Sequence, residues 1–380
     1  MLRVLLLDLD EVLIQQRAYH QSLKECVGRI GRWCGFEAVR LTDDDIALFE
    51  SLGVTSEWDS SAICAALLLD RAWSANPECA LPDSPDAPDG HLHDLAAPDF
   101  QAFLRATLER GVSGLEARQK TERRLLQGRN HTPAQRERLQ TILRYAYDGE
   151  RSLTNRIIQE LTLGSAVFES CYGKPAAIPG PGFLNTIDSP LVSARIAEQL
   201  VEWSVTPGRR AVVFTARPSR LPDGTGGTPE TEIGLMRLGL SALPFVSMGH
   251  LDWLCGQRGL VPQSLLKPSP VHALAALRLA AGDTLEGALA AAAALELDQQ
   301  DLGGWQALDE MHAVVFEDSF RGLQSARGAQ QSLDRIGVRL SLDLRGVAKP
   351  DVKRRALELA GGVVYPDFAS AARDILAEAL

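Results

Sequence analysis

The 380-residue sequence lacks the features that mark several specialised protein classes. No apolar run approaches the 18 residues that a membrane-spanning helix needs. The six cysteines form no C-x-x-C pair, which favours scattered, reduced thiols over disulfides or a zinc site. Basic residues are outnumbered, since 39 Lys and Arg stand against 49 Asp and Glu, for a net charge of −10. A nucleic-acid binder needs a basic footprint, so we expect neither nucleic acid nor a membrane as a partner.

The N-terminal segment also lacks a targeting signal. Only four apolar residues separate Arg3 from Asp8, which is too short for the core of a signal peptide, and this predicts a cytoplasmic protein. The composition, 45% hydrophobic and 23% charged, is that of an ordinary globular protein. A chain of this length exceeds one compact core and predicts about two domains. Nothing in the sequence indicates the oligomeric state.

Three short apolar runs, 4–7, 211–214 and 313–316, have the composition of strands buried on both faces of a parallel sheet. Each run ends in polar side chains: Asp8 and Asp10 after the first, Thr215 and Arg217 after the second, and Glu317 and Asp318 after the third. Ligands of open α/β sheets bind at the carboxyl ends of strands, which makes these residues candidates for a site. Taken singly, such acids are equally typical of solvated strand ends or helix caps.

A fourth segment carries a single lysine. Lys267 precedes two prolines, which favour an extended turn before a helical stretch that begins near 271. Taken alone, a lysine before proline is usually a solvated loop residue.

In this order the four segments resemble the motifs of the haloacid-dehalogenase-like superfamily of phosphotransferases. Asp8 and Asp10 match the first motif, D-x-D-x-[TV], and Thr215 matches the hydroxyl residue of the second. Lys267 matches the third in its Lys-Pro-x-Pro form, and Glu317 with Asp318 matches the acidic fourth motif. The resemblance covers residues 1–14 and 195–330. Glu11 and Ala216 depart from it, because both stand where glycine is common.

The resemblance implies a fold and an activity. The fold is α/β, a Rossmann-like doubly wound parallel sheet with a large, mostly helical insertion of the C1 cap type. The activity is that of a Mg²⁺-dependent phosphatase that hydrolyses a small phosphate monoester through an aspartyl-phosphate. The partner would then be a small phosphorylated metabolite.

The resemblance also implies a role for each matching residue. Asp8 would be the nucleophile, Asp10 the general acid and base, and Thr215 and Lys267 would bind the phosphate. Magnesium would be held by Asp8, Asp318, Glu317 and the backbone carbonyl of Asp10. Arg217 directly follows the second motif, where its guanidinium would suit phosphate, although a salt bridge is an equally good interpretation.

The spacing of the motifs requires an inserted domain. Asp10 and Thr215 are 205 residues apart, whereas a strand–helix connection needs only ~30. We therefore expect a catalytic core at 1–14 plus 189–380 and an insertion at 15–188, with helices at 43–52, 62–73, 100–110 and 133–147. Within it, 77–99 is rich in proline and acidic residues and predicts a flexible excursion. The basic segment 101–144 predicts a solvated helical surface, or alternatively a surface for a polyanion.

Two alternatives remain open from sequence. A phosphomutase would use the same residues while excluding water. A catalytically silent binding or regulatory protein could share the scaffold. A dehalogenase is disfavoured, because dehalogenases of this superfamily lack the second Asp of the first motif, which is Asp10 here. Further strands are expected at 337–342 and 362–365, and further helices at 191–202, 352–359 and 368–379.

Overall fold

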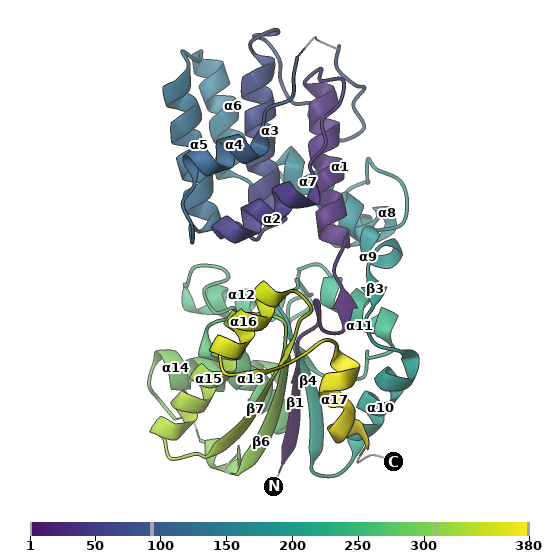
Figure 1. Cartoon of the computed structure of the whole chain (residues 1–380), viewed down its shortest axis with the longest axis vertical. Helices are drawn as coiled ribbons and strands as arrows, with labels where there is room; N and C mark the ends of the chain where they lie inside the picture. Colours follow the sequence, from purple (N-terminus) through teal and green to yellow (C-terminus); the bar gives the residue numbers. More distant parts are fainter. Residues whose placement is uncertain (1, 92–94, 302, 309, 378–380) are drawn as a thin grey trace. The chain divides into compact units, whose positions relative to one another are not determined.

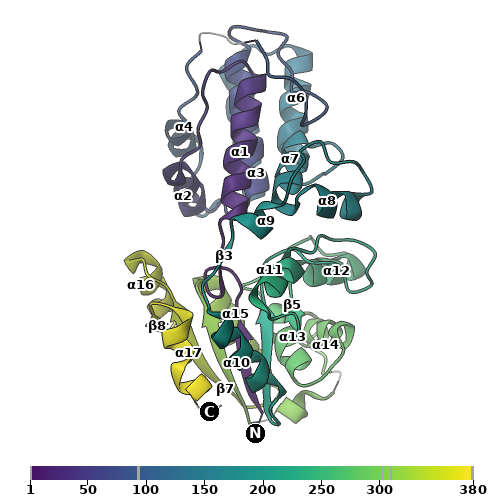
Figure 2. The ribbon, with the colours of Figure 1, turned by 90° about the vertical axis from the view of Figure 1, so that its right-hand side faces the viewer.

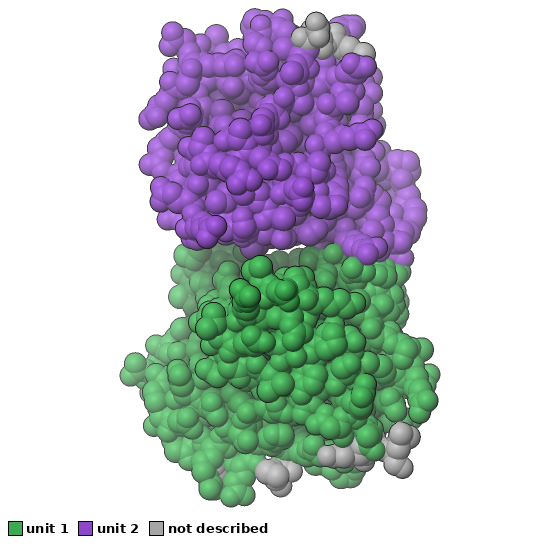
Figure 3. Space-filling view, viewed as in Figure 1, with its two compact units in different colours: residues 1–16, 188–380 green, residues 17–187 purple. Residues whose placement is uncertain are grey.

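The computed structural model describes residues 2–91, 95–301, 303–308 and 310–377. The chain divides into two compact units, coloured separately in Figure 3: unit 1 comprises residues 1–16 and 188–380, and unit 2 comprises residues 17–187. Unit 1 is an α/β unit and unit 2 is helical (Figures 1 and 2). Among the residues described, no helix has both the length and the apolar character that crossing a bilayer requires.

Unit 1 contains a six-stranded sheet in which every neighbouring pair is parallel, in the order β5-β4-β1-β6-β7-β8. The central strand β1 is also the first in the chain, so the order reverses direction on its two sides, as in doubly wound sheets. The strands are β1 (Arg3–Leu7), β4 (Arg209–Phe214), β5 (Phe245–Val246), β6 (Met311–Glu317), β7 (Leu340–Val347) and β8 (Val363–Tyr365).

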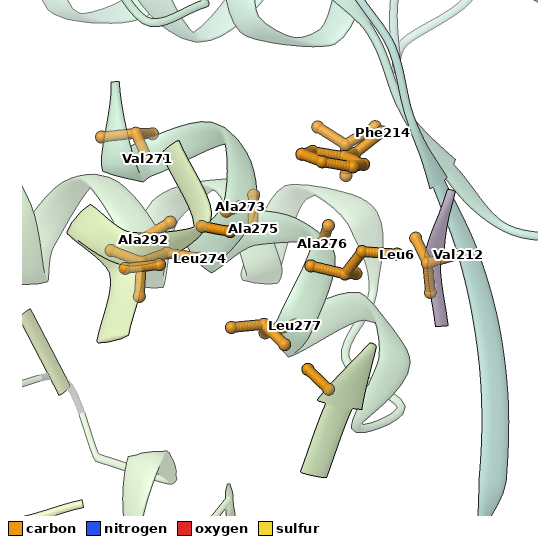
Figure 4. Close-up of a cluster of buried hydrophobic side chains, with 14 of the residues drawn as sticks. Leu6, Val212, Phe214, Val271, Ala273, Leu274, Ala275, Ala276, Leu277 and Ala292 are labelled. Atoms are coloured by element: carbon orange, nitrogen blue, oxygen red, sulfur yellow. The ribbon is translucent and has the colours of Figure 1, made fainter. Parts of the chain in front are cut away.

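Both faces of the sheet are buried, which explains why its central strands are continuous apolar runs. Successive side chains of β1 enter different cores: Val4 and Leu6 one, Leu5 and Leu7 the other. Figure 4 shows the first core, in which Leu6 and Phe214 lie beside helix α13. The helices of unit 1 are α10 (Ala194–Val205), α11 (Glu230–Leu238), α12 (Met248–Arg258), α13 (Pro270–Ala280), α14 (Leu285–Leu297), α15 (Phe320–Arg335), α16 (Asp351–Leu359) and α17 (Phe368–Ala377), with a short 3₁₀ turn at Trp305–Leu308.

Helices cover the two faces of the sheet separately. Residues of α13, α14 and α15 build the first core, and residues of α10, α11 and α17 build the second. In Figure 1, α13 to α15 lie to the left of the strands and α10 to the right. The predicted fold class, a doubly wound parallel α/β sheet with a helical insertion, is therefore confirmed.

Every element of unit 2 is a helix, within the residues described, and α3 packs against α1, α5, α6 and α7. Side chains set several of its helix starts, since Thr42, Ser113 and Thr132 each form a capping box with the residue three positions later. The helices are α1 (Ala18–Trp33), α2 (Asp43–Leu52), α3 (Glu57–Ala72), α4 (Phe100–Thr107), α5 (Gly114–Gly128), α6 (Pro133–Arg144), α7 (Leu153–Leu163), α8 (Ser165–Tyr172) and α9 (Phe183–Thr186).

The chain leaves and re-enters unit 1 along a two-stranded antiparallel ribbon. Strand β2 (Ile14–Gln15) precedes the helical unit, strand β3 (Ser189–Pro190) follows it, and Gln15 pairs with Ser189. The two ends of the insertion are thus held together by main-chain pairing that belongs to unit 1.

Several predicted bounds were wrong. The strand expected at 337–342 is β7, which begins at Leu340 and runs to Val347; Gly337 instead occupies a left-handed turn, with φ +76°. The charged Asp343 and Arg345 concealed this strand, because an ion pair at 2.7 Å lets Arg345 be buried. Helix α10 starts at Ala194 rather than 191, and α4 and α6 end at Thr107 and Arg144 rather than at 110 and 147.

The segment 77–99 contains no helix or strand among its described residues, 77–91 and 95–99. Two side chains of α6 donate hydrogen bonds to its carbonyls: Gln135 Nε2 to Pro77 O at 2.9 Å and Arg138 Nη1 to Cys79 O at 3.1 Å. Part of the basic 101–144 segment therefore holds the start of the acidic segment through its backbone.

Candidate active site

Three adjacent strands, β4, β1 and β6, end at the same edge of the sheet, and the predicted site residues directly follow them. In the register of the sheet, Leu7 of β1 pairs with Val213 of β4 and with Phe316 of β6. The residues that follow, Asp8, Thr215 and the Glu317-Asp318 pair, therefore emerge at the same edge. Residues more than 300 positions apart in sequence are brought together by this arrangement.

Asp8 and Lys267 form a buried ion pair. Lys267 Nζ lies 3.0 Å from Asp8 Oδ1, and both side chains are less than a tenth exposed. The backbone N–H of Leu9 also donates to Asp8 Oδ1, at 2.9 Å. The Lys267 ammonium lies 3.9 Å from the centre of the Phe214 ring, which contributes a cation–π contact. The Lys267 ammonium thus contacts both the Asp8 carboxylate and the Phe214 ring.

Glu317 uses both carboxylate oxygens inside the protein. Lys267 Nζ donates to its Oε1, and the backbone N–H and hydroxyl of Ser319 donate to its Oε2 at 2.9 and 2.8 Å. Gly322, in the first turn of α15, leaves room for this carboxylate, because a Cβ there would lie 1.9 Å from Glu317 Oε1. The fully buried Glu317 is therefore the second counter-ion of Lys267.

Asp318, the next residue in the chain, pairs with a lysine from α16. Its Oδ2 accepts from Lys353 Nζ at 2.6 Å. Burial raises the pKa of Asp318 to about 6, and the Glu317 carboxylate contributes to the rise while Lys353 opposes it. Sequence reasoning missed Lys353, because its contact with Asp318 joins residues 35 positions apart and has no local pattern.

Negative charge is in excess at this centre, because three carboxylates face two lysines, Lys267 and Lys353. Ligand oxygens of Asp8, Glu317 and Asp318 lie within 4.8 Å of one another, and Lys267 is the cation inserted between two of them. Burial raises the pKa of Asp8 well above its usual value, with Glu317 adding to the rise and Lys267 opposing it. Burial lowers the pKa of Lys267, but Asp8 and Glu317 outweigh burial and leave that pKa raised. Three close carboxylate groups fit a hard divalent cation.

Thr215 is oriented as a hydroxyl donor. Its backbone N–H donates to Val246 O at 3.0 Å, and its Oγ1 accepts the backbone N–H of Arg217 at 3.2 Å. Since the hydroxyl oxygen already accepts, its proton is left to donate. The residue is fully buried at the end of β4.

Arg217 lies between two carboxylates. Its Nε donates to Asp10 Oδ1 at 2.6 Å, and its Nη2 donates to Asp188 Oδ2 at 2.8 Å. The Arg217 and Asp188 side chains are 1% exposed, whereas Asp10 is 22% exposed. Of the two interpretations of Arg217, a salt bridge and phosphate binding, the structure shows the salt bridge, and it is buried. Asp188 was missed as a partner, because it directly precedes β3 with no pattern to mark it.

The fold and the site together define a class. This is a doubly wound α/β protein with a helical insertion, which carries a carboxylate–lysine centre at the carboxyl ends of its three central strands.

Comparison with known proteins identifies a related fold. No protein-family model matches the chain, and no curated protein matches it. One solved structure, described as a structural-genomics target, is 17% identical over the whole of both chains, with a TM-score of 0.62. A second, a conserved haloacid dehalogenase-like protein of unknown function from Agrobacterium tumefaciens, is 12% identical over 99% of both chains, with a TM-score of 0.35. The first likeness shows a shared fold.

Proposed function

We propose that this protein is a haloacid-dehalogenase-like phosphatase that hydrolyses a small phosphate monoester with the help of Mg²⁺. One observation carries the proposal: Lys267 Nζ lies 3.0 Å from Asp8 Oδ1, in a centre that also contains Glu317 and Asp318. A buried carboxylate beside a lysine and a cation site suits nucleophilic attack on a phosphate. Under this proposal the helical unit, residues 17–187, is a cap of the C1 type.

The metal would be held mainly by Asp8 and Asp318, with the Asp10 carbonyl, because both Glu317 oxygens already accept hydrogen bonds. Mg²⁺ would supply positive charge that neutralises phosphate oxygens and orients the ester. Glu317 then acts chiefly by holding Lys267. This assigns different roles to the two acids of the Glu317-Asp318 pair.

In the first step a carboxylate oxygen of Asp8 attacks phosphorus, and the bond from phosphorus to the ester oxygen breaks. The leaving oxygen takes a proton from Asp10. Asp10 Oδ1 is occupied by Arg217, so Oδ2, which has no partner within the described residues, is the atom for this proton. The Thr215 hydroxyl donates to a phosphate oxygen, and Lys267 offsets the negative charge.

In the second step water attacks the phosphorus of the aspartyl-phosphate. Asp10 takes a proton from that water, the bond from phosphorus to Asp8 breaks, and inorganic phosphate leaves. The substrate is a small phosphorylated metabolite rather than a nucleic acid or a lipid surface, since the net charge of −10 gives no basic footprint. All six cysteines are free thiols, in keeping with a cytoplasmic enzyme.

The proposal is tested by phosphate release from a generic aryl phosphate in the presence of Mg²⁺. Asp8→Asn should abolish release, whereas the matched control Asp44→Asn, on the exposed side of α2, should not change it. Retained release in Asp8→Asn would overturn the assignment. If a sugar phosphate is supplied instead, transfer of its phosphoryl group to another hydroxyl of the sugar, without release of free phosphate, would indicate a mutase. Mg²⁺ binding without turnover over a broad panel of esters would indicate a binding protein.

A further inference from the structure

A cavity of about 340 Å³ opens in unit 1 next to Asp318. It lies where the turn after Asp10 meets the segments that follow β7 and β8. Its apolar wall includes Val12, Val347 and Phe368. Because Asp318 belongs to both the cavity and the acidic centre, a molecule bound at that centre can extend directly into the cavity.

The charged groups that line the cavity are not equivalent. Glu11 Oε1 accepts the backbone N–H of Gln16 at 3.0 Å, and Asp367 Oδ1 accepts that of Ser370 at 2.7 Å. Asp318 is paired with Lys353. Each acidic group therefore has at least one partner within the protein, and Asp318 is the one paired with a cation.

Lys349 is the exception. It is exposed at the cavity, two residues after the end of β7, and it makes no hydrogen bond or ion pair with any part of the chain that the structure describes. An ammonium group offers three donors and a full positive charge. Lys349 is thus the charged group of this cavity that has no partner within the described residues, and an ammonium group matches an anionic ligand.

Resting on the proposed function, we infer that the cavity receives the leaving group of the ester and that Lys349 binds a second anionic group on it. The substrate class is then a small phosphate monoester that also carries a carboxylate or a second phosphate. The volume lies near the lower end of the ~300–1,000 Å³ typical of ligand sites, so the leaving group has a few carbon atoms. The apolar wall contacts those carbons, and the acidic centre takes the reacting phosphate together with its cation.

The test uses three synthetic esters of matched length: propyl phosphate, 3-phosphonooxypropanoate and 1,3-propanediol bisphosphate. Release of inorganic phosphate with Mg²⁺ gives kcat/KM for each. The wild-type protein should prefer one or both of the doubly anionic esters over propyl phosphate by ~10–100-fold, the range expected for a charge-assisted hydrogen bond. The carboxylate and bisphosphate arms show which anion Lys349 binds.

Lys349→Ala should lower that preference to less than ~3-fold, and Lys349→Arg should restore part of it, because the charge returns. Lys120→Ala, in the helical unit, removes the same charge elsewhere and should keep the wild-type preference. Thermal unfolding of each variant checks that it folds.

Two failures are distinguishable. Equal kcat/KM for all three esters in the wild type, or an unchanged preference in Lys349→Ala, overturns the role of the cavity while leaving the phosphatase proposal in place. Absence of any release that depends on Asp8 overturns the proposed function, and the inference with it.

Discussion

Arg217 Nε lies 2.6 Å from Asp10 Oδ1, so the residue proposed as general acid is held by a buried guanidinium. The same guanidinium contacts Asp188, which directly precedes β3. Arg217, which follows β4, therefore connects Asp10 of the first motif to Asp188, where the chain re-enters unit 1. We assign it a positioning role for Asp10.

Arg217→Ala should destabilise the protein by about 3–5 kcal/mol, because it removes one member of the buried ion pair between Arg217 and Asp188. Chemical denaturation measures this loss. Arg335→Ala is the control, since its pair with Glu296 is exposed and should contribute no more than about 1 kcal/mol. Adding Asp188→Asn to Arg217→Ala should recover part of the stability. Equal losses in Arg217→Ala and Arg335→Ala would contradict the structural role of the buried pair.

Lys267→Met should have opposite effects on catalysis and on metal binding. Phosphate release should be lost, because the charge that offsets the phosphate is gone. Binding of Mg²⁺ at pH 8 should tighten, roughly tenfold, because the ammonium no longer competes with the cation for Asp8. Titration calorimetry checks the affinity, with Lys174→Met as the exposed control. Weaker binding in Lys267→Met would show that the lysine supports the cation site rather than competing with it.

Binding of Mg²⁺ should depend on pH with a definite sign. In the metal-free protein the pKa of Asp318 is about 6 and that of Asp8 is raised, both chiefly by burial. Below pH 6 the cation must displace a proton from Asp318, so affinity should fall about tenfold per pH unit for each proton displaced. Calorimetry in two buffers of different ionisation enthalpy would detect the released protons. The same affinity at pH 5 and pH 7.5 would contradict this account.

Two buried histidines should make the protein acid-sensitive. Burial lowers the pKa of His250 to about 4 and that of His272 to about 3, from 6.5. These folded-state values lie below the unfolded one, so the contribution to stability is complete above pH 6.5 and is lost as pH falls. Between pH 6.5 and 4 each histidine should reduce the free energy of unfolding by about 1.4 kcal/mol per pH unit.

Denaturant titrations at pH 7, 6 and 5 measure this slope. His250→Gln and His272→Gln should each make the slope shallower, even where they lower stability at pH 7. An unchanged slope in both variants would assign the acid sensitivity to other groups.

The parts of the site that sequence could predict are those with a local pattern. An apolar run that ends in Asp8, Thr215 or Glu317 predicts a buried strand and the residue at its end, and the three strands are indeed neighbours. The order and spacing of these segments also predicted the helical insertion. The strand-end residues and the insertion could both be predicted because each prediction depends on a few residues and on no long-range contact.

The partners of those residues were not predictable in the same way. Asp188, Lys353 and Ser319 act through contacts that exist only after folding. Lys353 belongs to a helix that the sequence predicted at 352–359, but nothing local to that helix indicates that its side chain pairs with Asp318. The buried pair of Asp59 with Arg118 in unit 2, at 2.6 Å, joins residues 59 positions apart and has no sequence signal.

The ribbon formed by β2 and β3 bears on how such a chain could have arisen. Because Gln15 and Ser189 are paired neighbours, removing everything between them leaves two ends that a tight turn could join. The sheet would keep its strand order, and the cost of closing a longer loop grows only slowly with length. At this position, therefore, one inserted domain can replace another, in evolution or by engineering, without a change in the strand order of the sheet.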